Sequence, residues 1–254
     1  MNRALTRHRT RALLTSGTPW AAATTCTLLG GLLFWVNADD FTRYSQRAAA
    51  DPYLLASINA TQGVAQPSIT NLGVVGALVI PFITMRLYAE ERRAGTAAWA
   101  RTLPASDTAA TTAKYTAALA ATAVLLAASL TQPLALWLAG PITWSHIAAG
   151  YIGLAALYAT LTATGLAISA LAPSPGVAAS VALTVNLGLI VAGLWTNPDN
   201  PGLAATIVRW SPITRLDPFS AGLVDLSALA WYATLTATAL TITTIATTTE
   251  RHRG

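Results

Sequence analysis

Six long apolar segments, separated by shorter polar ones, are the feature that most constrains how this chain folds. They cover approximately residues 17–36, 67–85, 115–137, 146–171, 177–195 and 226–247. Each is about 20 residues long or a little longer, which lets a helix rising about 1.5 Å per residue cross about 30 Å of hydrocarbon. Only 10% of the 254 residues are charged, whereas soluble domains average about 25%. The sequence therefore predicts one all-α integral membrane domain, residues 1–254, with six transmembrane helices.

The distribution of basic residues predicts how these helices are oriented. We assign the N-terminus, the loop 86–114 and the C-terminus to the inside, and they hold eleven of the fifteen Lys and Arg residues. The segments that we assign to the outside, 37–66, 138–145 and 196–225, hold the other four. Basic residues concentrate in cytoplasmic loops, so we expect both termini in the cytoplasm. The net charge of +5 then reflects topology, and we expect no nucleic-acid partner.

The N-terminal segment 1–14 carries Arg3, Arg7 and Arg11 at i, i+4 and i+8 spacing. In a helix these side chains share one face. A short interfacial helix on the inner membrane surface suits this pattern, because basic side chains are attracted to anionic lipid headgroups. The alternative is a disordered basic start that only fixes the orientation of the chain.

The apolar segments contain few groups that call for a chemical explanation. Pro81 lies inside the second one and lacks an N–H, so a carbonyl one turn earlier needs a donor from a neighbouring helix. The most polar interior residues are Asn71, Gln132 and Asn186, and within these approximate bounds there is no Asp, Glu, Lys or Arg. Ion-driven carriers usually need intramembrane carboxylates or histidines. The sequence therefore disfavours an ion-coupled carrier.

Motifs for catalysis and metal binding are missing from the sequence. The only lysine, Lys114, follows Ala113, so no Gly-x-x-x-x-Gly-Lys phosphate-binding loop exists. His8, His146 and His252 are too far apart in sequence for a local metal motif, and a single cysteine, Cys26, excludes an intrachain disulfide. We therefore expect this chain to have no catalytic residues, no metal and no bound cofactor of its own.

The loop 86–114, RLYAEERRAGTAAWARTLPASDTAATTAK, is the most distinctive polar segment. We expect Gly95 to permit a turn, Thr96 to cap a short helix and Pro104 to end it, with Ser106 or Asp107 capping the next helix. A compact turn between two helices is the alternative, although helical hairpins need only about 2–8 connecting residues. An exposed ion pair of Glu91 contributes about 0–1 kcal/mol, so we expect Glu91→Ala to leave the protein level nearly unchanged.

The loop resembles the one between the second and third membrane helices of ABC type-2 transporter permeases. The resemblance rests on Glu90-Glu91-Arg92-Arg93, Gly95-Thr96 and Leu103-Pro104, and on 217–253, which is similar to the last loop and helix of these permeases. The gliding-motility and nitrous-oxide-reductase-maturation permeases are the most similar branch. The chain departs from them in carrying Ala and Trp where the helix after Gly95-Thr96 is often rich in Leu. The resemblance implies a cytoplasmic coupling helix that docks onto an ATPase, with coupling residues Glu90, Glu91, Arg92, Arg93, Gly95, Thr96, Trp99, Leu103 and Pro104.

These observations suggest the membrane subunit of an ATP-driven ABC exporter that moves an amphipathic or lipid-like compound outward. Two copies, or one copy and a related permease, would pair with two copies of a separate P-loop ATPase subunit that binds ATP and Mg. The alternative is a non-transporting membrane scaffold or immunity protein that recruits a cytoplasmic partner through the same loop. We expect a multi-pass protein of the plasma membrane, and the abundance of Ala and Thr suggests a high-GC bacterium.

Overall fold

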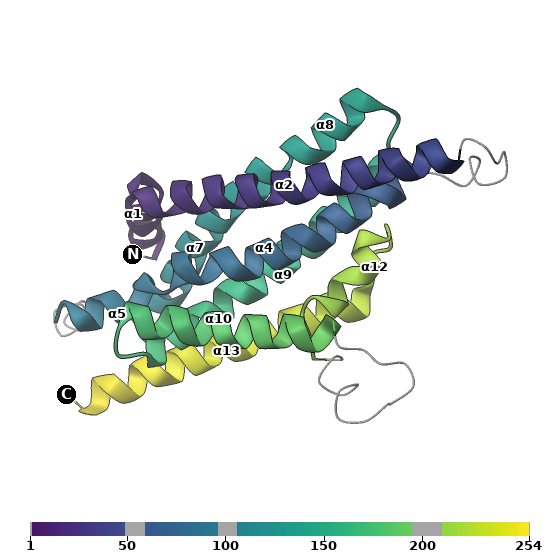
Figure 1. Cartoon of the computed structure of the whole chain (residues 1–254). Coiled ribbons are helices and arrows are strands. Elements are labelled where there is room, and N and C mark those ends of the chain that lie inside the picture. Colours follow the sequence, from purple (N-terminus) through teal and green to yellow (C-terminus); the bar gives the residue numbers. More distant parts are fainter. Residues whose placement is uncertain (1, 49–58, 96–105, 195–209, 254) are drawn as a thin grey trace.

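All regular structure in the described residues is helical. The computed structural model (Figure 1) describes residues 2–48, 59–95, 106–194 and 210–253, although not the side chains of 2–5, 8, 191–194 and 251–253. The helices in chain order are α1 (Asn2–Thr15), α2 (Gly17–Ala48), the π-helical turn η1 (Thr61–Ala65), α4 (Gln66–Thr84), α5 (Arg86–Arg93), α7 (Asp107–Ser129), α8 (Thr131–Ala139), α9 (Trp144–Leu171), α10 (Pro175–Leu194), the 3-10 turn η2 (Thr214–Leu216), α12 (Asp217–Ser220) and α13 (Leu226–Arg253).

Five helical stretches in the described part of the chain are long and apolar enough to cross a membrane. They are Gly17–Ala48, Thr61–Arg93, Asp107–Ala139, Trp144–Leu171 and Leu226–Glu250. The remaining predicted segment, 177–195, falls in α10, whose described apolar part, Pro175–Ile190, is shorter than these five. The prediction of an all-α membrane protein is confirmed in this coarser form, with five candidate spans.

The described parts of the polar stretch 37–66 are largely helical. Helix α2 continues to Ala48, and helical structure resumes at η1. Residues 37–48 include neither Gly nor Pro, and Arg43 forms an i, i+4 ion pair with Asp39 at 2.8 Å. Nothing local ends the helix where the apolar run ends. The helix therefore extends beyond residue 36, where the apolar segment ends.

The third predicted segment, 115–137, is also divided differently. Its helix starts earlier, at Asp107, so Lys114 lies in α7 and not in a loop. The chain bends at Leu130 and continues as α8 to Ala139. The expected outer hairpin 138–145 is therefore shorter, because α9 already begins at Trp144.

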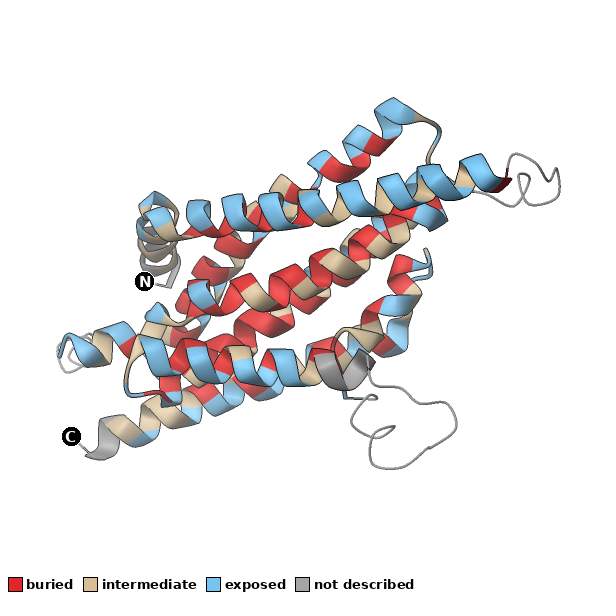
Figure 2. Ribbon diagram, viewed as in Figure 1, coloured by how far each residue is buried: buried red, intermediate tan, exposed pale blue. Residues whose placement is uncertain are grey.

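The core of the helix bundle lies between α4 and α9, where Figure 2 shows the densest burial. Small residues let these two helices approach closely. A Cβ added to Gly76 of α4 would lie 2.2 Å from a ring carbon of Tyr158, and one added to Gly150 of α9 would lie 2.3 Å from Cδ1 of Ile69. Glycine at these two positions therefore permits the close packing of α4 against α9.

A hydrogen bond between helices compensates for Pro81. Proline has no N–H, so the carbonyl of Ala77, four residues earlier in α4, lacks its usual helical donor. The side-chain amide of Asn186 in α10 donates to this carbonyl at 2.9 Å, and Asn186 is buried. This contact confirms that a neighbouring helix satisfies the freed carbonyl, and it explains why α10 carries a buried amide.

Several chain segments that are distant in sequence gather at one end of the bundle. Figure 1 shows α1, α5, the turn between α9 and α10, and the end of α13 together at this end, with α12 at the other. Both termini therefore lie at the end that carries α5. Trp20 and Trp35 of α2 are 58% and 72% exposed, and tryptophan is enriched at membrane interfaces.

Candidate functional site

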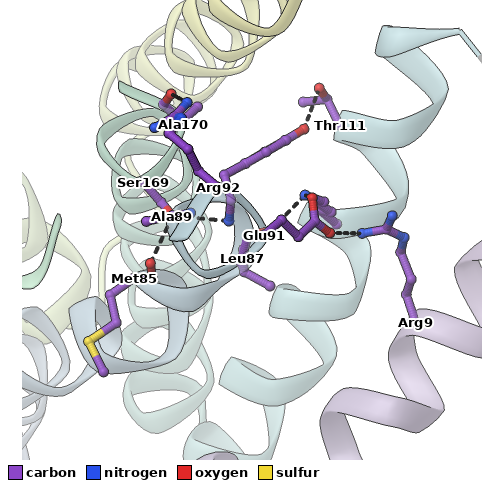
Figure 3. A network of polar contacts seen from close by, with 11 residues as sticks. Arg9, Met85, Leu87, Ala89, Glu91, Arg92, Thr111, Ser169 and Ala170 are labelled. Carbon is purple, nitrogen blue, oxygen red and sulfur yellow. Dashed lines mark hydrogen bonds and ion pairs between the residues drawn. The ribbon is translucent and has the colours of Figure 1, made fainter. Parts of the chain in front are cut away.

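Helix α5 (Arg86–Arg93) is the described part of the loop that the sequence analysis singled out. It follows α4 after a break at Met85, and Ser169 of α9 holds its first turn. The Ser169 hydroxyl accepts hydrogen bonds from the backbone N–H groups of Tyr88 and Ala89, both at 3.2 Å, and donates to the Met85 carbonyl at 3.0 Å (Figure 3). Ala89 is fully buried. Helix α5 is therefore docked on α9.

The carboxylate of Glu91 joins α5 to two further helices. One oxygen lies 3.3 Å from Nη1 of Arg9 in α1, and the other lies 2.6 Å from Nζ of Lys114 in α7 (Figure 3). The Lys114 ammonium also donates to the Leu87 carbonyl at 2.6 Å and lies 3.4 Å from the ring centroid of Tyr88. These five residues form what we name the Glu91 cluster.

Burial of Lys114 corrects the expectation for Glu91→Ala. The Lys114 side chain is only 1% exposed, and that of Glu91 is 31% exposed. A buried ammonium without its carboxylate is costly, because few groups remain to replace its water shell. The pair is therefore not an ordinary exposed ion pair, and loss of Glu91 must destabilise the fold as well as any partner contact.

Arg92 joins α5 to the ends of two more helices. Its guanidinium donates to the backbone carbonyls of Ala170 and Ala172, at the C-terminal end of α9. It also pairs with Glu250 of α13, with 2.6 Å between Nη2 and Oε1. The last carbonyls of a helix lack intrahelical donors and carry partial negative charge, so a cation stabilises them. Through Glu91 and Arg92, α5 contacts α1, α7, α9 and α13.

The opposite face of α5 is open to solvent. Arg86, Glu90 and Arg93 are exposed and follow one another at i, i+4 and i+7. Arg86 and Glu90 form a loose pair at 3.8 Å, with more than half of each side chain exposed. Gly95 ends the described segment with φ of +70°, a left-handed conformation that favours glycine, which confirms the predicted turn. We name Arg86, Glu90 and Arg93 the open face of α5.

The remaining predicted coupling residues lie outside the described residues: Thr96, Trp99, Leu103 and Pro104. The next described residue is Ser106, whose hydroxyl accepts a hydrogen bond from the backbone N–H of Ala109 at 3.3 Å. The predicted cap of the next helix is therefore confirmed at Ser106. One residue later, the Asp107 carboxylate accepts a hydrogen bond from Thr248 of α13 at 3.2 Å.

The N-terminal segment forms helix α1, so the structure does not show the alternative disordered start. It packs against α7, and Arg9 reaches Glu91. Arg7 and Arg11 are exposed on α1, whereas the side chain of Arg3 is not among those that the structure describes. A position of this helix on the membrane surface stays a prediction.

Sequence reasoning missed Arg9 and Lys114 as partners of Glu91. Arg9 does not belong to the i, i+4, i+8 series of Arg3, Arg7 and Arg11. In the sequence, Lys114 is the last residue of a polar segment that was assigned to a loop. No local pattern could have paired residues that are 82 and 23 positions from Glu91. Among the described residues, no three His, Cys, Asp or Glu side chains gather as a possible metal site.

Comparison with known proteins does not assign the chain to a family. No protein-family model matches the sequence, and no curated protein matches it either. What the chain does must therefore be inferred from the geometry around α5 and from the apolar helices.

Proposed function

We propose that this chain is the membrane subunit of an ATP-driven exporter of the ABC type-2 kind, and that α5 transmits force from a separate ATPase. One observation carries the proposal: the Glu91 cluster and Arg92 tie α5 to α1, α7, α9 and α13. A push on α5 would therefore be distributed to four helices. An ordinary connecting turn would need no such set of buried and bridging charges.

The proposed partner meets the open face of α5. Arg86, Glu90 and Arg93 are exposed to solvent and leave room for a protein surface of complementary charge. Two copies of this chain, or one copy and a related permease, would pair with two copies of the ATPase subunit, which would bind ATP and Mg. The substrate would be an amphipathic or lipid-like compound, moved outward.

In this proposal the chain crosses the plasma membrane six times. Helix α10, 20 residues from Pro175 to Leu194, would provide the crossing beyond the five candidate spans, because about 1.5 Å per residue gives it about 30 Å. The end of the bundle that carries α5 and both termini would face the cytoplasm. The excess of Lys and Arg in the segments at this end supports that orientation.

Arg93→Glu tests the coupling role with little risk to the fold, because Arg93 is exposed. Exposed substitutions usually change stability by no more than about 0.5 kcal/mol. Arg43→Glu is the matched control, since it makes the same charge change at the far end of α2. We expect Arg93→Glu to weaken pull-down of the P-loop ATPase subunit and its export activity, with both variants at equal membrane abundance. Normal binding and export by Arg93→Glu and by Glu90→Lys would refute the coupling role.

Cysteine labelling tests the orientation. Cys26 is buried and is the sole cysteine, so Cys26→Ala provides the background. Ala94→Cys, beside the open face of α5, should react with an impermeant maleimide only after cells are permeabilised. Gln46→Cys, exposed near the other end of α2, should react in intact cells. The reverse pattern would place α5 outside and exclude a cytoplasmic ATPase as its partner.

A further inference from the structure

A groove runs between α1 and α5 at the end of the bundle that carries both termini. Its volume is about 380 Å³, and it is open on one side. Apolar side chains form much of its lining, among them Leu13 of α1, Ile83 of α4 and Leu87 of α5. Five charged residues line it as well: the cations Arg9, Arg86 and Lys114 and the carboxylates Glu90 and Glu91. The groove therefore combines an apolar wall with a charged rim in which cations exceed carboxylates by one.

The two arginines retain donors for a further ligand. Arg9 contacts Glu91 through one nitrogen, Nη1. Among the described residues, Arg86 pairs only loosely, with Glu90 at 3.8 Å, and both of these side chains are more than half exposed. A guanidinium has five N–H donors in a planar fork that fits phosphate oxygens, so each arginine can bind a phosphate while it keeps its carboxylate. Lys114, by contrast, is fully engaged within the Glu91 cluster.

The position of the groove suits a lipid headgroup. Ile83 and Leu87 belong to the candidate span Thr61–Arg93, close to its end, and Leu13 lies on α1 just before the span that begins at Gly17. The exposed Arg7 and Arg11 lie on the other face of α1, where they line a separate hollow, so the groove itself depends on Arg9 and Arg86. Basic pockets between membrane helices attract anionic headgroups, and each nearby Lys or Arg strengthens that attraction.

We propose that this groove binds one anionic phospholipid of the surrounding bilayer. Its phosphodiester would contact Arg9 and Arg86, and its acyl chains would lie against Leu13, Ile83 and Leu87. A free inorganic phosphate would leave the apolar wall in contact with water, whereas a phospholipid covers it. The lipid would join α1 to α5 beside the Arg9–Glu91 pair. The proposal requires membrane insertion and does not depend on an ATPase partner.

The test uses the full chain purified in detergent and a direct measurement of bound lipid. We expect native mass spectrometry to show retained phosphatidylglycerol, and dioctanoyl-phosphatidylglycerol to raise the unfolding temperature of delipidated protein in a saturable manner. Dioctanoyl-phosphatidylcholine and inorganic phosphate are the comparison ligands. Equal stabilisation by inorganic phosphate would show a free-anion site only, and equal stabilisation by phosphatidylcholine would remove the role of charge. Either result overturns the proposal.

Three variants locate the site. Arg9→Gln with Arg86→Gln should weaken phosphatidylglycerol binding at least about tenfold, because two charge-assisted contacts are lost. Arg43→Gln with Arg47→Gln removes the same number of charges from the far end of α2 and should bind normally. Because Arg9→Gln also breaks the pair with Glu91, Ala12→Phe serves as a second variant: it fills the groove from an exposed position and changes no charge. Undiminished binding by Ala12→Phe, or equal losses in both double variants, overturns the proposal. Ala12→Phe changes no residue of the open face or of the Glu91 cluster, so ATPase pull-down on this variant separates loss of lipid binding from failure of the coupling role.

Discussion

Glu91→Gln is the most informative single substitution, because it removes a charge and nearly preserves the shape of the side chain. It leaves the Lys114 ammonium, 1% exposed, without its carboxylate. Removing one partner of a fully buried ion pair costs about 3–5 kcal/mol. The side chain of Glu91 is 31% exposed, and Lys114 keeps its hydrogen bond to the Leu87 carbonyl and its contact with the Tyr88 ring. Both features reduce the loss of stability. We expect Glu91→Gln to lower the free energy of unfolding by about 2–3 kcal/mol.

A double-mutant cycle separates the ion pair from other effects of the substitution. Lys114→Met keeps the length of the side chain and removes the buried charge, while Glu91 keeps its pair with Arg9. We expect it to cost only about 0–1 kcal/mol. The double variant should then be about as stable as Lys114→Met alone, which corresponds to a coupling energy of about 2–3 kcal/mol, the full cost of Glu91→Gln.

Equilibrium unfolding in mixed micelles of dodecyl maltoside and sodium dodecyl sulfate, followed by tryptophan fluorescence, measures these differences. Arg43→Gln is the control, because its i, i+4 pair with Asp39 is exposed and contributes about 0.3–0.5 kcal/mol. The reasoning fails if Glu91→Gln costs no more than Arg43→Gln, or if the effects of Glu91→Gln and Lys114→Met are additive.

Two further substitutions test the packing of the bundle in the same unfolding assay. Asn186→Leu should cost about 1–3 kcal/mol, because a buried carbonyl loses its donor. In a Pro81→Ala background, the restored N–H of residue 81 can bond the Ala77 carbonyl, so Asn186→Leu should cost clearly less. Equal costs in both backgrounds would contradict the inference that Asn186 compensates for Pro81. Gly76→Ala should cost about 1–3 kcal/mol, since its new Cβ would lie 2.2 Å from a ring atom. Gly31→Ala, with nothing within 4 Å of its Cβ, should be neutral or stabilising, and a similar loss at both glycines would refute the close-packing argument.

Features set by short-range chemistry could be predicted from the sequence. Apolar length identified the candidate spans, Pro81 required a donor from another helix, and the cap at Ser106 and the turn at Gly95 follow from local preferences. The end of α2 at Ala48 was missed, because a polar helix can extend beyond the apolar run when no residue breaks it. Polarity alone does not locate the end of a helix.

The charge pairs of the candidate site could not be predicted, because their partners are distant in sequence. Arg9 and Glu91 are 82 positions apart, and Arg92 and Glu250 are 158 apart. The presence of each charged residue, taken alone, is also explained by a solvent-exposed loop end or by the excess of basic residues in cytoplasmic loops. Only the three-dimensional arrangement shows that Lys114 is buried and that Glu91 bridges two cations.

The Arg92–Glu250 pair sets an order of events during biogenesis. Arg92 emerges from the ribosome long before Glu250, so the contact with α13 cannot form until α13 has been synthesised. The contact of Arg92 with the C-terminal carbonyls of α9 likewise has to wait until α9 has been made. Helix α5 therefore gains its anchorage to α13 only after that helix has entered the bundle. A subunit that docks on α5 would, for this reason, meet its finished surface only after α13 has been inserted.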